Sequence, residues 1–400
     1  MKILLVNKFL FPHGGSETYI FKLNEILKQK GHEVQFFGMN DTKRIVNNNV
    51  ESYTTNIDFH ESNFIKKISY PIKIIYSIEA RKKIRKVLDD FSPDVVHLNN
   101  FNYQLTPSII LEIVKWRNDN NKKCNIVYTA HDYQLICPNH SLFNFRTNKI
   151  CEKCIKGNYF NCIKYKCIHN SVIRSFIGTI ESYFWKKMKT YKYIDSVICP
   201  SYFMMKKLNE YELLKNKTIV LHNFVEQPTH RTVTKKDYVI YFGRYSAEKG
   251  INSLVEACNR IPQIKFIFAG QGPLEDKINS TKNINNVGFK SGEELRKLVE
   301  EARFSICPSI VFENCPFSVI ESQMYGTPVL IADIGGIPEL VDKNKTGDTF
   351  VSGNVEDLVS KIQIMWEKTK SSNEYSEKCL QKKFVSTEQY YDEIMSIYSK

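Results

Sequence analysis

Two glutamates eight residues apart, Glu313 and Glu321, stand on either side of a candidate helix start in the segment 313–329, ENCPFSVIESQMYGTPV. Pro316 fits the first turn of a helix, because a backbone N–H there would have no partner within the helix. The unpaired amides near Cys315 and Ser318 carry partial positive charge, which favours an anion such as phosphate. We therefore expect an anion to bind where this helix begins.

The two carboxylates suggest what accompanies that anion. A carboxylate at 313, in the loop before the helix, can accept hydrogen bonds from sugar hydroxyls. A carboxylate at 321, more than one turn inside the helix, can accept them from the two hydroxyls of a ribose. Sugar, diphosphate and ribose, in that order, are the parts of a nucleotide sugar. A helix with an unrelated acidic residue at each end is the alternative, but it does not explain Pro316.

Two cations follow another apolar run. Arg244 and Lys249 are five residues apart, after the run YVIYF and Gly243 and before a helical segment. Two cations beside a helix N-terminus can hold a diphosphate. A solvated basic turn is the alternative, and the strand–glycine–arginine order favours the phosphate interpretation.

Glycines occupy two more loops of this kind. Gly14 and Gly15 follow the run KILLV, and Gly270 and Gly272 follow KFIFA. Glycine allows a backbone to approach a ligand closely. Each pair is equally compatible with a tight turn.

His131 ends the apolar run NIVYTA. It can act as a general base, donate a hydrogen bond to a substrate, or simply complete a turn. Its place at the carboxyl end of a strand favours a functional role, since ligands of open α/β sheets bind at that edge.

Five of the eleven cysteines cluster, and they are spaced as metal ligands can be. Thiolates at such spacing hold Zn²⁺ tetrahedrally. One interpretation is therefore a structural zinc ion on Cys151, Cys154, Cys162 and Cys167, with Cys137 or His140 as a substitute ligand. Free thiols in a lysine-rich loop are the other. Disulfides are disfavoured in a reducing compartment.

Short apolar runs alternate with helical segments along the chain, which predicts α/β structure with parallel, doubly wound sheets. The rhythm restarts after a polar segment with Pro228, so we expect two Rossmann-like domains with a cleft at the strand ends. The predicted boundaries are 1–222, with a Cys-rich insertion at about 137–170, a linker at 223–236, a second domain at 237–384 and a last helix within 385–400. Predicted strands are 3–6, 33–38, 94–98, 125–130, 196–199, 238–242, 265–268, 284–287, 304–307, 328–331 and 349–351.

Composition narrows the function classes. The net charge of +13 suits anionic lipid or phosphorylated small molecules. No usual nucleic-acid-binding signature is present, so we expect no nucleic-acid partner. The opening MKILLVNKFL is a first strand and no signal peptide, and no apolar run of about 18 residues occurs. We expect a cytoplasmic protein that can work at the inner face of the membrane.

Two basic amphipathic stretches, 64–86 and 173–193, raise the question of an anionic membrane surface. Packing against the first sheet explains their apolar stripes equally well. We favour packing for 173–193, and the interpretation of 64–86 stays open.

Together these motifs resemble a GT-B glycosyltransferase of family 4, the retaining group 1 transferases, over nearly the whole length. Glu313 and Glu321 match its E-x7-E motif, followed by Gly326, Thr327, Pro328 and Val329. The other matches are Gly243-Arg244 with Lys249-Gly250, Gly270 to Pro273, the loop Gly14-Gly15-x-Glu17, and the segment GGIPELV at 335–341.

The resemblance implies a role for each matched residue. Glu321 binds the ribose, Glu313 contacts the donor sugar, and Arg244 and Lys249 hold the diphosphate. His131 is the active-site histidine near the sugar. The remaining donor-site residues are Gly14, Gly15, Gly272 and the backbone of Asn314, Cys315, Pro316 and Phe317. The last helix is expected to cross back to the first domain.

The implied activity is transfer of a sugar, with retention, from a UDP or GDP sugar to a glycan or lipid-linked acceptor, as in bacterial cell-surface polysaccharide biosynthesis. No metal cofactor is needed for such chemistry, because cations and the helix N-terminus stabilise the leaving diphosphate. The alternative is a non-catalytic sugar-nucleotide-binding or scaffold protein of the same fold, organised by the cysteine cluster.

Overall fold

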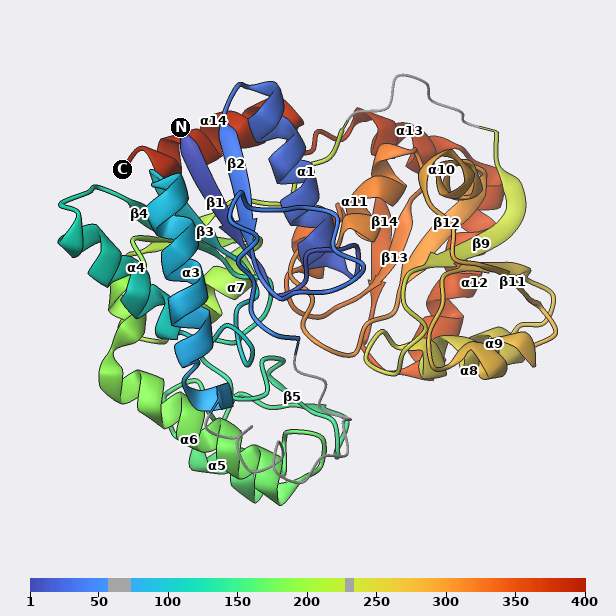
Figure 1. Ribbon diagram of the computed structural model, residues 1–400. Helices are drawn as coiled ribbons and strands as arrows, with labels where there is room; N and C mark the ends of the chain where they lie inside the picture. The colour runs from blue at the N-terminus through green and yellow to red at the C-terminus, as the bar shows by residue number, and fades with distance from the viewer. Residues whose placement is uncertain (57–72, 227–233) are drawn as a thin grey trace. The chain divides into compact units, whose positions relative to one another are not determined.

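The computed structural model describes residues 1–56, 73–226 and 234–400. They form two compact units, 1–221 with 388–400 and 222–387. Each unit is built on one six-stranded sheet (Figure 1). The predicted linker 223–236 and the basic stretch 64–86 lie partly outside the described residues.

The first unit holds a parallel sheet in the order β2-β1-β3-β4-β7-β8. Its inner strands are short and buried along their length, as expected of a sheet covered on both faces. The strands are β1 (Lys2–Val6), β2 (Glu33–Phe37), β3 (Val95–Leu98), β4 (Asn125–Thr129), β7 (Ser196–Cys199) and β8 (Thr218–Val220).

The second unit holds a parallel sheet in the order β11-β10-β9-β12-β13-β14. Its strands are β9 (Lys236–Phe242), β10 (Phe266–Ala269), β11 (Ile284–Gly288), β12 (Ala302–Cys307), β13 (Val329–Ala332) and β14 (Gly347–Phe350). The two doubly wound parallel sheets predicted from the strand–helix alternation are confirmed. The two orders differ, because the second sheet has two strands beyond its first strand and the first sheet has one.

Helices connect the strands in both units. Those of the first unit are α1 (Gly15–Gln29), α3 (Ile78–Phe91), α4 (Ser108–Asp119), α5 (Phe160–Lys164), α6 (Val172–Met188), α7 (Tyr202–Leu208) and α14 (Thr387–Tyr398). Those of the second are α8 (Ile251–Arg260), α9 (Glu275–Asn279), α10 (Gly292–Glu300), α11 (Phe317–Met324), α12 (Val355–Ser371) and α13 (Glu374–Gln381). No helix of the described ranges is long and apolar enough to cross a membrane.

The last helix, α14, is fixed to the first unit by buried tyrosines (Figure 1). The Tyr390 hydroxyl lies 2.6 Å from that of Tyr19 on α1, and the Tyr398 hydroxyl lies 2.6 Å from Nδ1 of His97 on β3. Both chains of hydrogen bonds meet at the Thr129 hydroxyl, 3.1 Å from Tyr19 Oη and 2.7 Å from His97 Nε2. Burial lowers the pKa of His97 to about 3, so the network joins neutral groups.

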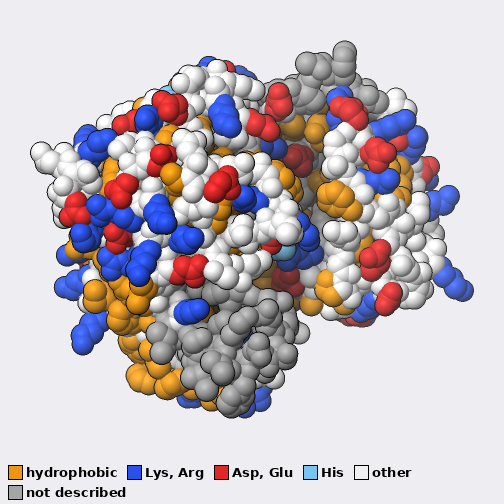
Figure 2. Space-filling view, in the orientation of Figure 1, with side chains coloured by type: hydrophobic (Ala, Val, Ile, Leu, Met, Phe, Trp, Pro, Cys, Tyr) orange, Lys and Arg blue, Asp and Glu red, His pale blue; other side chains and the backbone are white. Residues whose placement is uncertain are grey.

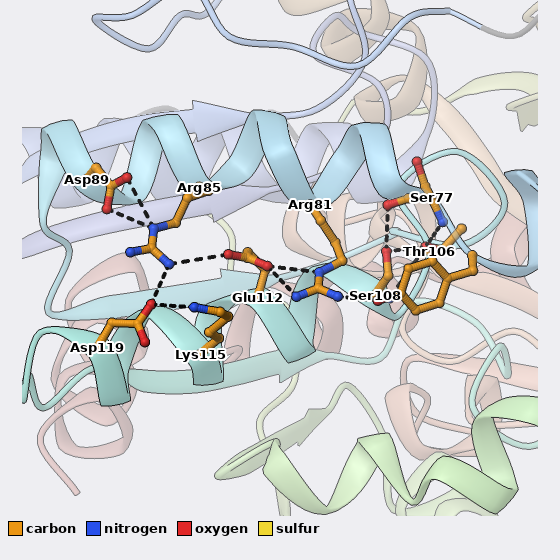
Figure 3. A network of polar contacts seen from close by, with 10 residues as sticks. Ser77, Arg81, Arg85, Asp89, Thr106, Ser108, Glu112, Lys115 and Asp119 are labelled. Atoms are coloured by element: carbon orange, nitrogen blue, oxygen red, sulfur yellow. Dashed lines mark hydrogen bonds and ion pairs between the residues drawn. The ribbon is translucent and has the colours of Figure 1, made fainter.

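On the same unit, α3 and α4 are joined by a polar network (Figure 3). Glu112 of α4 is almost buried and accepts a hydrogen bond from Arg81 Nε at 2.8 Å, while Arg85 Nη1 lies 3.4 Å from its other oxygen. Arg85 also donates to Asp119 at 2.8 Å and to Asp89. Two arginines thus compensate one buried carboxylate, which would be costly alone.

The packing predicted for 173–193 holds for only part of its apolar side chains: α6 buries Trp185 and half-buries Ile177, Tyr183 and Phe184, but it leaves Phe176, Ile180 and Met188 exposed. The buried residues of α6 are Ser175, Gly178, Thr179, Glu181 and Trp185. Glu181 lies inside, where burial raises the pKa of its carboxyl group to about 8. The carboxyl group is therefore protonated in the folded protein through neutral pH.

This burial makes stability depend on pH. A carboxyl group whose pKa is raised from 4.5 to about 8 on folding stabilises the fold fully below pH 4.5 and loses that contribution as pH rises through 8. Glutamine cannot ionise. We therefore expect Glu181→Gln to gain about 1.4 kcal/mol per pH unit relative to the wild type across this window, measured by urea unfolding.

Glu25→Gln, at an exposed position of α1, is the matched control and should show no such trend. A constant difference between wild type and Glu181→Gln across the window would contradict the prediction.

Candidate active site

Each sheet has one point where the strand order reverses, and ligands of open α/β folds bind there. In the first sheet this point lies between β1 and β3, and in the second between β9 and β12. The sequence-predicted residues of the second unit lie in the loops that leave β9, β10 and β12 and in the first two turns of α11. Those of the first unit lie in the loops after β1 and β4.

In the second unit, Lys249 and Glu313 form an ion pair across the switch point. Lys249 Nζ donates to Glu313 Oε1, and Ser309 Oγ donates to the same oxygen at 3.2 Å. Burial disfavours the charged ammonium, but the carboxylate of Glu313 outweighs this and raises the pKa of Lys249. The residue expected at the diphosphate and the residue expected at the sugar are therefore hydrogen-bonded neighbours.

The backbone of Glu313 is held by the two glycines of the GGIPELV segment. Gly336 N–H donates to the Glu313 carbonyl at 2.7 Å. A Cβ on Gly335 would lie 2.5 Å from that carbonyl oxygen, and Gly335 has a positive φ of 64°. Only glycine fits this contact without displacing the Glu313 backbone. The segment therefore fixes the backbone position from which the Glu313 side chain extends.

Glycines also let the β9–α8 and β10–α9 loops touch through their backbones. A Cβ on Gly270 would lie 1.9 Å from the Gly243 carbonyl oxygen, and one on Gly272 would lie 2.6 Å from the Tyr245 carbonyl oxygen. Gly250, just before α8, would bring a Cβ to 1.7 Å from the Pro308 carbonyl oxygen. The AGxGP and KG patterns are thus packing requirements of this site. Arg244 is exposed between these contacts.

The helix predicted around Pro316 is α11, with Pro316 at the N-cap and Phe317 as its first residue. Cys315 is buried, and Asn223 Nδ2 donates to its carbonyl at 2.7 Å. Asn314 is also buried, and Glu321 lies in the second turn of the helix. Burial raises the pKa of the Cys315 thiol to about 12, so this cysteine contributes as packing and backbone.

In the first unit, the loop with Gly14 and Gly15 leads into α1. Gly14 is the N-cap, and a Cβ on Gly15 would meet no atom within 4 Å. Glu17 is buried and accepts hydrogen bonds from Asn7 Nδ2 at 2.8 Å and Ser16 Oγ at 2.9 Å. The acidic residue of the GGxE motif therefore holds the loop to the end of β1.

His131 lies just beyond β4 and is oriented by Asn99 at the end of β3. Its Nε2 is 2.8 Å from Asn99 Oδ1, and its ring packs edge-on against Tyr19 at 5.0 Å between centroids. The Asn99 amide nitrogen faces the carbonyls of Val6 and His97, so its oxygen accepts and His131 Nε2 carries the proton. Burial lowers the pKa of His131 to about 3, which keeps the ring neutral.

The neighbouring Asp132 also has a perturbed ionisation. Burial raises the pKa of its carboxyl group to about 6, while its hydrogen bond from the Gln134 amide, 2.9 Å long, opposes the rise. A neutral histidine and a carboxyl group that ionises near pH 6 thus follow β4 in sequence.

The five clustered cysteines come together in the first unit. Cys137, Cys151, Cys154, Cys162 and Cys167 line one cavity of about 10 Å³. Among residues 1–56, 73–226 and 234–400, no group of three or more His, Cys, Asp or Glu has the arrangement of a metal site. Zinc in this cavity stays a prediction, which metal analysis of the purified chain tests.

Sequence reasoning missed the residues that position the predicted ones. Asn99 orients His131, Asn7 holds Glu17, and Ser309 supports Glu313. Asn7 and Asn99 could have been noticed, since each is a polar residue at the end of an apolar run, where α/β ligands bind. Ser309 follows a run in the same way.

Comparison with known proteins gives matches over nearly the whole chain. The family model described as Glycosyltransferase Family 4 matches residues 13–227, and that described as Glycosyl transferases group 1 matches 224–381. An uncharacterized 42.6 kDa protein in the cps region of Klebsiella pneumoniae is 24% identical over 363 residues, 85% of this chain and 87% of that protein. The putative colanic acid biosynthesis glycosyltransferase WcaL of Salmonella typhimurium is 26% identical over 153 residues, 34% of this chain and 38% of that protein.

Among solved structures, Anabaena HepE in complex with UDP is similar. Its TM-score is 0.67 at 15% identity, with 100% of both chains covered. At this identity the likeness shows a shared fold.

The contact between Gly335 and Glu313 can be tested by one methyl group. We expect Gly335→Ala to lower the free energy of unfolding by about 2–4 kcal/mol, since the new Cβ overlaps the Glu313 backbone and alanine is strained at positive φ. Gly353→Ala is the matched control, because Gly353 has a φ of 76° but its Cβ would be 3.9 Å from the nearest atom. The control should lose only about 1 kcal/mol. Equal losses in urea unfolding would contradict the role of Gly335.

Proposed function

The chain belongs to glycosyltransferase family 4 and is a glycosyltransferase, and we propose that it transfers a sugar, with retention of configuration, from a UDP sugar to a glycan or lipid-linked acceptor. We place this reaction in the assembly of a bacterial cell-surface polysaccharide. The family, the GT-B fold and the transferase activity predicted from the sequence are confirmed. The donor, the stereochemistry and the acceptor are the proposal.

The observation that carries the proposal is the Lys249–Glu313 pair. In a nucleotide sugar the β-phosphate and the sugar are covalent neighbours, and here a cation and a carboxylate suited to them are hydrogen-bonded neighbours. On donor binding, Lys249 and the exposed Arg244 would meet the diphosphate, and the Glu313 carboxylate would accept from sugar hydroxyls. UDP is our choice because Anabaena HepE has been solved with UDP. GDP is the second choice.

The remaining donor contacts follow from the loops around α11. The amides at its N-terminus would face the diphosphate, and Glu321 would bind the ribose hydroxyls. As the bond between the sugar and UDP breaks, negative charge grows on the departing diphosphate. Fixed cations and amides stabilise that charge without rearranging, which is the main source of rate enhancement in such sites.

His131 is proposed to act on the sugar side of the reaction. Asn99 holds His131 through Nε2, and we propose that the neutral ring serves as a positioned polar group beside the reacting sugar. We propose that transfer takes place on the face of the sugar from which UDP leaves, because the sequence offers no certain nucleophile.

Nucleotide binding tests the donor site directly. A ligand that binds only the folded protein raises its melting temperature. We expect UDP at about 100 times its Kd to raise the melting temperature by about 5 °C or more, with smaller shifts for ADP and CMP. Glu321→Ala should abolish the shift, whereas Glu367→Ala, at an exposed position of α12, should keep it. No shift with any nucleotide would sink the donor proposal, and the largest shift with GDP would change the donor.

Release of UDP from UDP-hexoses tests the role of His131. Water can replace an unknown acceptor, forming the new bond to the sugar as the bond to UDP breaks. We expect His131→Ala to lower kcat about 100-fold with an unchanged thermal shift by UDP, as loss of a positioned polar group would. Asn99→Leu, which removes the acceptor for Nε2–H, should lower kcat by a smaller factor. Full activity in His131→Ala would remove this residue from the mechanism.

A further inference from the structure

The outward face of α6 is apolar. Val172, Ile173, Phe176, Ile180 and Met188 are exposed by 48%, 72%, 52%, 40% and 46%. At 3.6 residues per turn these five positions fall on one side of the helix. Figure 2 shows hydrophobic side chains gathered over the part of the first unit where Figure 1 places α6. We call these five residues the α6 face.

Neighbouring structure extends the α6 face. Phe160 of α5 is 65% exposed, and its ring centroid lies 5.3 Å from that of Tyr183 on α6. Contiguous exposed apolar surface on a folded protein usually marks an interaction site. Single exposed apolar residues would need no such explanation, but a run of five along one helix does.

The charge around this face selects the partner. Residues 153–192 hold nine Lys or Arg and one acidic residue, Glu181. That one carboxyl group is buried and protonated at neutral pH. Arg174 and Lys187 are exposed on the same helix. Within residues 153–192 the exposed charged side chains are therefore all cationic, and they lie in the same segment as the α6 face.

We propose that the α6 face docks on an anionic lipid bilayer. Apolar side chains flanked by lysine and arginine, on a helix lying flat, are the features by which amphipathic helices bind a membrane interface. At 1.5 Å per residue, the 17 residues of α6 would lie along about 25 Å of that interface. A second copy of the chain would bring like charges together, which disfavours a dimer through this face. The inference stands on this surface and does not depend on which donor or acceptor the enzyme uses.

Vesicle co-sedimentation of the full chain, without nucleotide, tests the proposal. We expect binding to phosphatidylglycerol vesicles, weak binding to phosphatidylcholine vesicles, and loss of binding at high salt. Ile173→Ser with Phe176→Ser should weaken binding at least about tenfold. Arg174→Glu with Lys187→Glu, which leaves the apolar residues in place, should weaken it at least about tenfold.

Matched controls come from exposed positions of the second unit. Phe289→Ser with Ile364→Ser exchanges one exposed phenylalanine and one exposed isoleucine, and Lys368→Glu with Lys370→Glu reverses two exposed charges. Both should bind vesicles like the wild type, and all variants should melt like the wild type. Unchanged binding in both α6 variants, or absent binding by the wild type, would overturn the proposal. Light scattering tests the alternative. A wild-type dimer that dissociates in the Ile173→Ser, Phe176→Ser variant would show that the α6 face binds a second copy of the chain instead.

Discussion

The ion pair between Lys249 and Glu313 is the constraint around which the second unit is arranged. It joins the loop after β9 to the loop after β12, on the two sides of the switch point of the sheet. A second contact, from Ile310 N–H to the Glu248 carbonyl at 3.1 Å, holds the same two loops by their backbones. Glycines at 250, 270, 272 and 335 allow backbones to approach closely around the pair. An uncompensated charge here would be costly, so pair and loops stabilise each other.

Much of this could be predicted from the sequence. Buried strands such as VVHL, SVIC and VLIA are short apolar runs bounded by polar residues, so the two parallel sheets follow from pattern alone. The position of β9 next to β12 in the sheet cannot be predicted from this pattern. The contact of Gly335 with Glu313 cannot be predicted from it either, because the contact joins residues from separate loops and depends on a backbone approach of a few ångströms. Motif spacing predicts which residues belong to the donor site, and tertiary contacts decide how each of them is held.

Several features of the first unit cannot be predicted from the sequence pattern. Three-residue β8 and the hairpin of β5 (Phe143–Asn144) and β6 (Lys149–Ile150) are too short to leave a periodic signal. No feature of the sequence predicts the hydrogen bond between Asn99 and His131, since the strands that they follow, β3 and β4, become neighbours only in the sheet. The motif match left the role of Glu17 open, and in the structure its side chain accepts hydrogen bonds from Asn7 and Ser16.

The helix α6 carries the strongest conflict between periodicity and structure. Its apolar stripe predicts burial, but the buried side holds Trp185 together with serine, glycine, threonine and a protonated glutamate. The exposed Ile173 and Phe176 forgo hydrophobic burial, and the buried carboxyl group of Glu181 carries a desolvation cost. Both unfavourable features, the exposed apolar side chains and the buried carboxyl group, occur on α6. The packing of Trp185 against Tyr76 fixes which side of α6 faces inward, and the proposed membrane docking would account for the apolar side chains on the other side.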